Sequence, residues 1–264
     1  MTAKDPGATV SAEMMAPETG VAGPDSTVAT ADARYRSLPL RSSAPLYWVS
    51  GLVLLGLGAV LGFVVVVAEA ALDASDRPIG EWFFALSGAH EALRQFAFDF
   101  AVIGSGHVTA PLAVVVGVLL FAFRRWRWGV WFATVSIGGL LISETFKFSV
   151  QRARPVWESP LATESSFSYP SGHTLSGVTT WVAIGVVALF VLPRPWSSVL
   201  GVVFLVVGVL MGPSRLLLGV HWLTDVLGGW LFGFGWLLFV SGIALRKWGV
   251  QSEHPQRELG GTGG

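Results

Sequence analysis

The chain has 264 residues, of which 52% are hydrophobic and only 13% are charged. Soluble domains carry about 25% charged residues, so this composition argues against a water-soluble globular protein. The 17 basic and 17 acidic residues cancel, which argues against nucleic-acid binding driven by net charge, and the absence of cysteine excludes disulfides and thiolate chemistry. Apolar stretches long enough to cross a bilayer recur along the sequence and indicate a polytopic membrane protein.

Polar segments flank the apolar part of the chain. The N-terminal segment is rich in Ala, Thr, Pro, Gly and Ser and has no apolar period, which is typical of a disordered tail. We therefore divide the chain into a disordered N-terminal tail (residues 1–45), a six-span domain (46–245) and a C-terminal tail (246–264).

The central part is predicted to be an all-α bundle of six transmembrane helices. A helix needs roughly 20 apolar residues to cross the hydrocarbon core. The predicted spans are Leu46–Ala68, Ala101–Phe123, Gly129–Phe146, Thr174–Leu192, Trp196–Met211 and Val226–Leu245.

The stretch Asp73–Asp99, between the first two spans, mixes apolar and charged residues. Trp82 and Phe83 alternate there with charges such as Asp76, Glu81 and Arg94. This pattern favours an amphipathic helix lying at the membrane interface over a seventh span.

Basic residues at the span ends predict the orientation. With the N-terminus inside, 11 of the 17 Lys and Arg residues fall on the cytoplasmic side, including Arg124, Arg125, Arg127 and the Arg246–Lys247 pair. The positive-inside rule then predicts a plasma-membrane protein with both termini in the cytoplasm.

Three stretches stand out at span ends on the other face, and the cations in two of them oppose this bias and are expected to have a separate role. They read KFSVQRARP at 147–155, YPSGH at 169–173 and SRLLLGVHWLTD at 214–225. Helix ends on one face of a bundle can converge into one pocket. Lys147, Arg154 and Arg215 would there surround an anion of high charge density, such as phosphate.

The Pro-Ser-Gly-His segment precedes a predicted helix. Backbone N–H groups at a helix start bind anions, and the Ser171 hydroxyl could add a further donor. Gly172 has no Cβ, so the backbone can approach the anion closely.

The two histidines of these stretches have different sequence neighbours. His221 and Asp225 are four residues apart on a predicted helix, so the carboxylate can fix the imidazole tautomer and leave the other nitrogen free to attack. His173 has no such partner and is better placed as a general acid. We therefore expect in-line phosphoryl transfer to His221, followed by hydrolysis of the phosphohistidine.

His173, His221 and Asp225 could alternatively ligate a metal ion such as zinc. Three nearby cations would repel a divalent ion, and the stretches offer no cluster of carboxylates to offset them. We expect neither a metal nor another cofactor.

The patterns Lys-x6-Arg-Pro, Pro-Ser-Gly-His and Ser-Arg-x5-His-x3-Asp resemble the three signature motifs of the type-2 phosphatidic acid phosphatase family. This family is related to vanadium-dependent haloperoxidases and glucose-6-phosphatase. The resemblance covers residues 147–225 by motif and 46–245 by the six-span pattern.

The resemblance implies a metal-independent lipid phosphatase with a covalent phosphohistidine. It implies that His221 is the nucleophile, that Asp225 holds it, and that His173 protonates the leaving group. It also implies a set of residues that bind the phosphoryl oxygens: Lys147, Arg154, Ser171, Gly172 and Arg215.

The substrate expected from the pocket and the resemblance is a lipid phosphate or diphosphate at the extracytoplasmic face. Polyprenyl diphosphate, phosphatidylglycerophosphate and phosphatidic acid all remain open, as does the oligomeric state. A lipid phosphotransferase and an anion transporter or binding protein are the alternative functions.

Three charged residues near the motifs receive separate interpretations. Arg152 lies between the motif positions and is expected to contact lipid headgroups. Glu144 is either a functional group within the membrane or an ion-pair partner of a site cation such as Lys147. Glu164, in the loop between two motifs, is expected to be solvated or to tune entry of the substrate.

Overall fold

The computed structural model describes residues 41–249, in which every regular secondary-structure element is a helix. The elements are η1 (Arg41–Ser43), α2 (Ala44–Val67), α3 (Glu69–Ala89), α4 (Glu91–Gly104), α5 (Gly106–Ala122), α6 (Trp126–Val150), α7 (Gly172–Ser176), the π-helical segment η2 (Gly177–Val182), α8 (Ala183–Val191), α9 (Trp196–Leu217) and α10 (Leu223–Trp248). Residues 1–40 and 250–264, and with them most of both predicted tails, lie outside this described part. The inner end of each tail is helical: η1 begins at Arg41, and α10 continues to Trp248.

Five of the six predicted spans correspond to helices long and apolar enough to cross a membrane. These are η1–α2, α6, the continuous run from α7 through η2 to α8, α9 and α10. The last two spans extend beyond their predicted limits at the end that carries the third motif. Ser214 and Arg215 belong to the last turn of α9, and Asp225 belongs to the first turn of α10.

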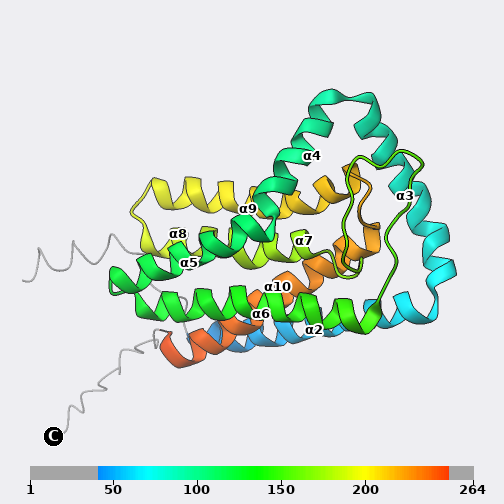
Figure 1. Cartoon of the computed structure of the whole chain (residues 1–264). Coiled ribbons are helices and arrows are strands. Elements are labelled where there is room, and N and C mark those ends of the chain that lie inside the picture. The colour runs from blue at the N-terminus through cyan, green and yellow to red at the C-terminus, as the bar shows by residue number, and fades with distance from the viewer. Residues whose placement is uncertain (1–40, 250–264) are drawn as a thin grey trace, which may run out of the picture. The chain divides into compact units, whose positions relative to one another are not determined.

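The region between the first and third spans differs from the prediction. The stretch Asp73–Asp99 was expected to form one helix, but His90 adopts an extended conformation and separates α3 from α4. Helices α4 and α5 form a pair bent by 49° at Ser105, which would make a sixth span if the pair crosses as one unit. Figure 1 shows α3 and α4 extending past one end of the bundle, beside the loop that joins α6 to α7.

Helices α2 and α10 pack backbone to backbone. A Cβ atom on Gly51 would lie 2.4 Å from the amide nitrogen of Phe239, and one on Gly242 would lie 2.5 Å from that of Trp48. Without a hydrophobic driving force between helices inside a bilayer, such close contact supplies the dispersion energy that holds them together. Glycine is therefore required on this face of α10.

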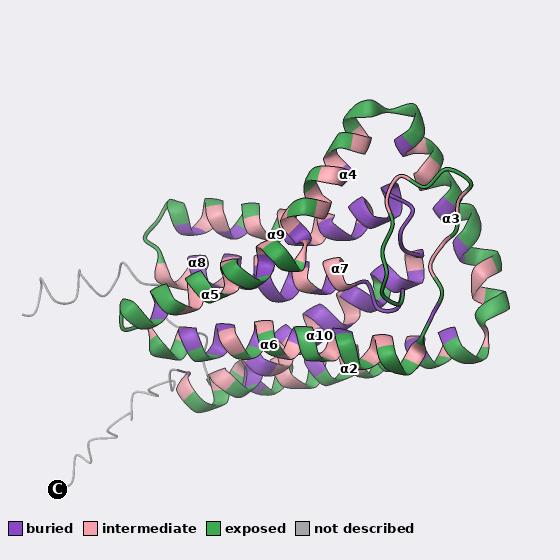
Figure 2. Cartoon of the chain, in the orientation of Figure 1, coloured by how far each residue is buried: buried purple, intermediate pink, exposed green. Residues whose placement is uncertain are grey.

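The opposite face of α10 packs on the fourth span. A Cβ on Gly229 would lie 2.7 Å from Cβ of Thr174, and one on Gly233 would lie 2.8 Å from Cβ of Val178. Helix α10 is thus enclosed between α2 and the fourth span, and this places its N-terminal turn inside the bundle end. Figure 2 shows buried residues along α7, α9 and α10, whereas much of α2 and α5 is exposed, as expected for lipid-facing surfaces.

Replacement of Gly51 by alanine is expected to destabilise the bundle, because the new Cβ meets backbone that cannot rotate away. Overpacking of this kind costs about 1–3 kcal/mol. Thermal unfolding of the detergent-solubilised protein should show a lowered midpoint for Gly51→Ala. Gly56→Ala on the same helix is the matched control, since a Cβ there has no atom within 4 Å. Equal midpoints for the two variants would contradict the α2–α10 packing.

Candidate active site

The three motif stretches meet at one end of the bundle. Lys147 lies in the last turn of α6, His173 in the first turn of α7, and Arg215 in the last turn of α9. A cavity of about 550 Å³ collects five of the eight predicted site residues on its wall: Lys147, Arg154, Gly172, His173 and His221. The other three, Ser171, Arg215 and Asp225, lie behind that wall and are buried.

His221 lies in the turn before α10, so its predicted helical position is wrong. The helix begins at Leu223, and Asp225 turns its carboxylate back to accept a hydrogen bond from the Trp222 amide at 2.8 Å. This N-terminal capping brings Oδ2 of Asp225 to 3.4 Å from Nδ1 of His221. The expected pairing is present, but it is produced by a helix cap instead of helical spacing.

The environment of His221 defines its tautomer. Arg154 Nη1 lies 3.0 Å from Nε2 of His221, and a guanidinium can only donate, so Nε2 must carry the lone pair. Burial, with the nearby charges of Arg154 and Arg215, lowers the pKa of His221 to about 3 against the opposing effect of Asp225. The imidazole is therefore neutral at pH 7, with its proton on Nδ1 toward Asp225 and its lone pair at the cavity.

Ser168 completes the support of this histidine, and sequence reasoning missed it. Its hydroxyl lies 2.5 Å from Oδ2 of Asp225 and 3.3 Å from Nδ1 of His221. The side chain is fully buried. Its only signal in the sequence is its place three residues before Ser171, in the stretch that leads into the second motif.

Arg154 lies on the cavity wall and links the loop between α6 and α7 to the turn before α10. Its guanidinium donates to the carbonyl oxygens of Ser166 at 2.6 Å, Val220 at 2.8 Å and Phe167 at 3.2 Å. Burial is the main reason why the pKa of Arg154 is lowered from its usual value. The group is thus fixed in direction beside Nε2 of His221.

Lys147 and Gly172 form the adjacent part of the wall. A Cβ on Gly172 would lie 3.3 Å from the Lys147 ammonium, so the glycine leaves room for the cation beside the start of α7. Glu144 lies 3.6 Å from the same ammonium and so forms the ion pair that was one of its two predicted roles. Lys147 also approaches the Ser166 hydroxyl at 3.3 Å.

His173 faces the cavity with one ring nitrogen already engaged. Its Nε2 lies 3.2 Å from the carbonyl oxygen of Ala101 near the end of α4, and a carbonyl can only accept. Nε2 therefore carries a proton, which leaves Nδ1 for a bound molecule. Gly104 allows this approach, since a Cβ there would lie 2.8 Å from the His173 ring.

The Ser171 side chain does not reach the cavity. It is the N-cap of α7, and its oxygen lies 3.5 Å from the Thr174 amide and 3.0 Å from the Thr174 hydroxyl. Its own amide donates to the carbonyl oxygen of Asp225 at 3.0 Å. In this structure Ser171 therefore joins the second and third motifs.

Arg215 is buried and reaches the cavity through Glu164. The Glu164 carboxylate lines the cavity and is exposed, as expected, and it also accepts a hydrogen bond from Arg215 at 2.5 Å, a pairing that the sequence did not predict. An anion that binds Arg215 from the cavity must displace this carboxylate.

Arg152 is the largest departure from the predicted site. It was expected to contact headgroups, but its side chain is 1% exposed and bonds to Asp225 at 2.8 Å and Asp76 at 2.9 Å. Asp76 is a residue of α3, and it also accepts from the Thr224 amide at 3.2 Å. The available signal was that Arg152 belongs to a basic cluster that opposes the positive-inside bias.

The loop between α6 and α7 is held against α3 and the turn before α10 by aromatic side chains. Trp157 donates to the carbonyl oxygen of Gly219 at 2.6 Å and stacks on Phe84 of α3, with ring centroids 4.7 Å apart. Trp222 donates to the carbonyl oxygen of Ala153 at 3.1 Å. These contacts keep Arg152 and Arg154 in place although the loop has no regular structure.

The described part of the chain, residues 41–249, contains no group of three His, Asp or Glu side chains arranged as metal ligands. Metal independence remains a prediction for the experiment below.

Arg152→Met is expected to lower the thermal unfolding midpoint strongly, because it leaves the Asp225 and Asp76 carboxylates buried without their shared cation. Removing one member of a buried ion pair costs about 3–5 kcal/mol. Asp76→Asn should cost less, since Arg152 keeps Asp225. Arg94→Met is the control, because the Arg94–Glu91 pair is exposed and such pairs contribute about 0–1 kcal/mol. Similar midpoints for Arg152→Met and Arg94→Met would refute a structural role for the buried network.

Comparisons with known proteins agree with this geometry. A family model described as the PAP2 superfamily matches residues 128–248, which include all three motifs. Phosphatidylglycerophosphatase B of Bacillus subtilis is 35% identical over 162 residues, which cover 59% of this chain and 78% of the relative. The undecaprenyl-diphosphatase of Sulfolobus acidocaldarius is 32% identical over 134 residues, which cover 48% of this chain and 61% of the relative.

A solved structure is also similar. The crystal structure of a transmembrane PAP2-type phosphatidylglycerolphosphate phosphatase from Bacillus subtilis aligns with a TM-score of 0.63 and 26% sequence identity. The alignment covers 74% of this chain and 95% of that chain. With the motif residues gathered at one bundle end and a relative matched over most of its length, the chain belongs to the PAP2 superfamily.

Proposed function

We propose that this chain hydrolyses a lipid phosphate or diphosphate by way of a phosphohistidine formed on His221. Membership of the PAP2 superfamily makes it a lipid phosphatase, and the covalent step is the part that the site geometry supports. The observation that carries the proposal is the neutral, buried His221 with Nε2 toward the cavity and Nδ1 toward Asp225.

In the first step, Nε2 of His221 attacks phosphorus in line with the leaving oxygen. The N–P bond forms as the P–O bond to the lipid breaks, and the departing oxygen takes a proton from Nδ1 of His173. For this step His173 must carry a proton on both ring nitrogens, a state that the negative charge of the bound substrate favours. The imidazolium that forms at His221 is stabilised by Asp225. The charge that develops on the phosphoryl oxygens is stabilised by Lys147 and Arg154, and by Arg215 once Glu164 has moved away.

In the second step, water hydrolyses the phosphohistidine. His173 is now neutral and takes a proton from the attacking water, as microscopic reversibility requires. The N–P bond breaks, and inorganic phosphate leaves with the proton balance restored. His173 thus alternates between acid and base, while His221 alternates between free and phosphorylated.

The shape of the cavity supports a lipid substrate. From Lys147 and His173 it continues between α5 and α6, past Gly106, Ala113 and Gly117 on one side and Leu140 on the other. Lys147 and Phe132 both line it, and 1.5 Å per helical residue separates them by roughly 22 Å. Small residues along α5 leave space for an alkyl chain whose phosphate rests among the cations.

The names of the relatives support two of the three candidate substrates. One relative is named a phosphatidylglycerophosphatase and another an undecaprenyl-diphosphatase, so both substrate classes are proposed here together with phosphatidic acid. The phosphotransferase alternative would need a second alcohol to replace water. The anion-transporter alternative is less consistent with a nucleophile held by a buried carboxylate.

We also propose that the site faces the extracytoplasmic side of the plasma membrane. The turns and helix end at the opposite end of the bundle carry Arg124, Arg125, Arg127, Arg194, Arg246 and Lys247. Basic residues that flank spans favour the cytoplasmic side, which would place both termini there.

The central test is phosphate release from a panel of lipid phosphates by the purified protein in detergent with EDTA. We expect EDTA to leave the rate unchanged and His221→Ala to lower it by at least ~10⁴-fold, because the covalent route is lost. His107→Ala on exposed α5 is the control and should keep the wild-type rate. Substrate labelled with ³²P should leave label on the wild-type protein after a basic quench, but none on His221→Ala. Loss of activity in EDTA, or label retained by His221→Ala, would defeat the mechanism.

Cysteine labelling tests the proposed orientation, and the chain has no native cysteine to interfere. Glu158, in the loop at the candidate site, and Arg194, between α8 and α9, are both exposed. In intact cells, a membrane-impermeant maleimide should label Glu158→Cys and leave Arg194→Cys unlabelled. The reverse pattern would place the site on the cytoplasmic side.

A further inference from the structure

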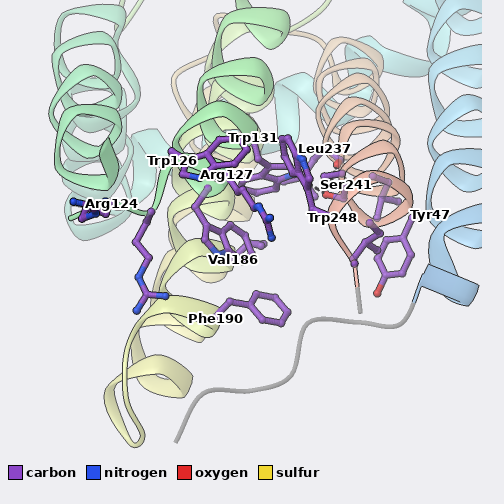
Figure 3. A pocket seen from close by; sticks show the side chains of 16 residues that line it. Tyr47, Arg124, Trp126, Arg127, Trp131, Val186, Phe190, Leu237, Ser241 and Trp248 are labelled. Carbon is purple, nitrogen blue, oxygen red and sulfur yellow. Dashed lines mark hydrogen bonds between the residues drawn. The ribbon is translucent and has the colours of Figure 1, made fainter. Parts of the chain in front are cut away.

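A second cavity of about 570 Å³ lies at the bundle end opposite the candidate active site. It is formed by the start of α6, the end of α8 and the end of α10, and Figure 3 shows Trp126, Trp131 and Trp248 gathered there. Trp126 begins α6 and Lys147 lies near its end, so the arginine-bearing end of this cavity lies roughly 30 Å from Lys147 along the helix at 1.5 Å per residue, although Trp131 of one cavity is next to Phe132 of the other. That separation equals the thickness of a hydrocarbon core of about 30 Å.

The cavity has a cationic rim. Arg124, Arg125 and Arg127 all line it, and no acidic residue does. Within residues 41–249, neither Arg124 nor Arg127 forms an ion pair with a carboxylate. The Arg127 guanidinium lies 5.5 Å from the centre of the Trp126 ring, a cation–π distance that limits its freedom. Arg124 and Arg127 therefore give the rim positive charge that a bound anion would neutralise.

The interior of the same cavity is apolar and aromatic. Trp128 packs edge-on against Trp131, with ring centroids 5.6 Å apart, and stacks on Phe190 at 5.3 Å. The indole N–H of Trp131 donates a hydrogen bond to the Ser241 hydroxyl at 3.1 Å. Ala244, one turn farther along α10, is small and leaves the space beside the aromatic wall open.

We propose that this cavity is a binding site for one anionic phospholipid of the leaflet opposite the active site. The phosphodiester would lie at the arginine rim, and the first part of an acyl chain would lie against Trp131 and Phe190. A soluble anion would use the arginines but not the apolar wall, and a neutral lipid would leave the arginine charges uncompensated. Only a ligand with both parts, at membrane depth, complements the whole surface.

The arginines of this cavity are remote from Lys147 and His221, so a lipid whose headgroup is held there would be bound but not hydrolysed. Its walls are the ends of α6 and α10, whose other ends carry Lys147 and Asp225. A lipid bound there would brace the two helices that position those residues. Binding at this cavity does not depend on the proposed phosphohistidine chemistry.

The test measures lipids retained on the full-length protein by native mass spectrometry. The protein in neutral detergent is offered equal amounts of phosphatidylglycerol and phosphatidylcholine with the same acyl chains. Inorganic phosphate is present throughout, so that anion binding at the catalytic cavity is equal in all samples. We expect the wild type to retain one phosphatidylglycerol in preference to phosphatidylcholine.

Two variants separate a site from general surface attraction. R124Q/R127Q removes the two charges, each worth about 1 kcal/mol near a membrane surface, and should weaken phosphatidylglycerol retention at least ~10-fold. Ala244→Trp fills the cavity without changing any charge and should also lower retention ~10-fold. Arg194→Gln is the matched control, since Arg194 lies at the same bundle end and does not line the cavity.

Each alternative outcome overturns the proposal. Equal retention of the two lipids by the wild type would show that the arginines do not select an anion. Loss in R124Q/R127Q with full retention in Ala244→Trp would show diffuse attraction to surface charge. Equal loss in Arg194→Gln would show that any basic residue at this face has the same effect.

Discussion

The Asp225 carboxylate is the group on which the arrangement of the site depends. It is completely buried, and it accepts hydrogen bonds from Arg152 at 2.8 Å, Ser168 at 2.5 Å and the Trp222 amide at 2.8 Å, besides facing His221. A buried anion is tolerated only when it is paired and fully hydrogen-bonded, so the surrounding groups are held in fixed positions around it. The backbone carbonyl of the same residue receives the Ser171 amide, which brings the second motif to the third. One residue thus gathers three separate segments of the chain.

The charge balance around Asp225 extends beyond the motifs. Burial opposes the charge of Arg152, but Asp225 and Asp76 outweigh that effect and raise the pKa of Arg152 above its usual value. Helix α3 contributes Asp76 and the Phe84 ring that stacks on Trp157, so it closes the end of the bundle over the loop from α6 to α7. This arrangement explains how a loop without regular structure holds Arg154 at 3.0 Å from His221. The positions of Arg154 and His221 thus depend on α3, which contributes no residue of the three motifs.

The two ends of the bundle use cations in different ways. At the end with the candidate active site, Arg152 and Arg215 are buried and paired with carboxylates, and Lys147 and Arg154 lie on the cavity wall. At the opposite end Arg124 and Arg127 remain at the rim of an aromatic cavity that no acidic residue lines. Buried pairs are rigid because breaking them is costly, whereas exposed arginines can follow a mobile lipid headgroup. The same residue type therefore fixes the geometry at one end, and at the other it would bind the lipid that we propose.

The helical membrane class, five of the spans, the motif residues and the pairing of His221 with Asp225 could all be predicted from the sequence. Apolar run length and residue spacing are local properties, and they are visible in one dimension. The sequence did not predict the break at His90, the burial of Arg152 by Asp76 of α3, the contact of Ser168 with Asp225, or the pairing of Glu164 with Arg215. Except for the break at His90, these features join residues separated by 51 to 76 positions in the sequence. Only the tertiary structure decides them, because a charged side chain takes its partner from whatever helix packs beside it.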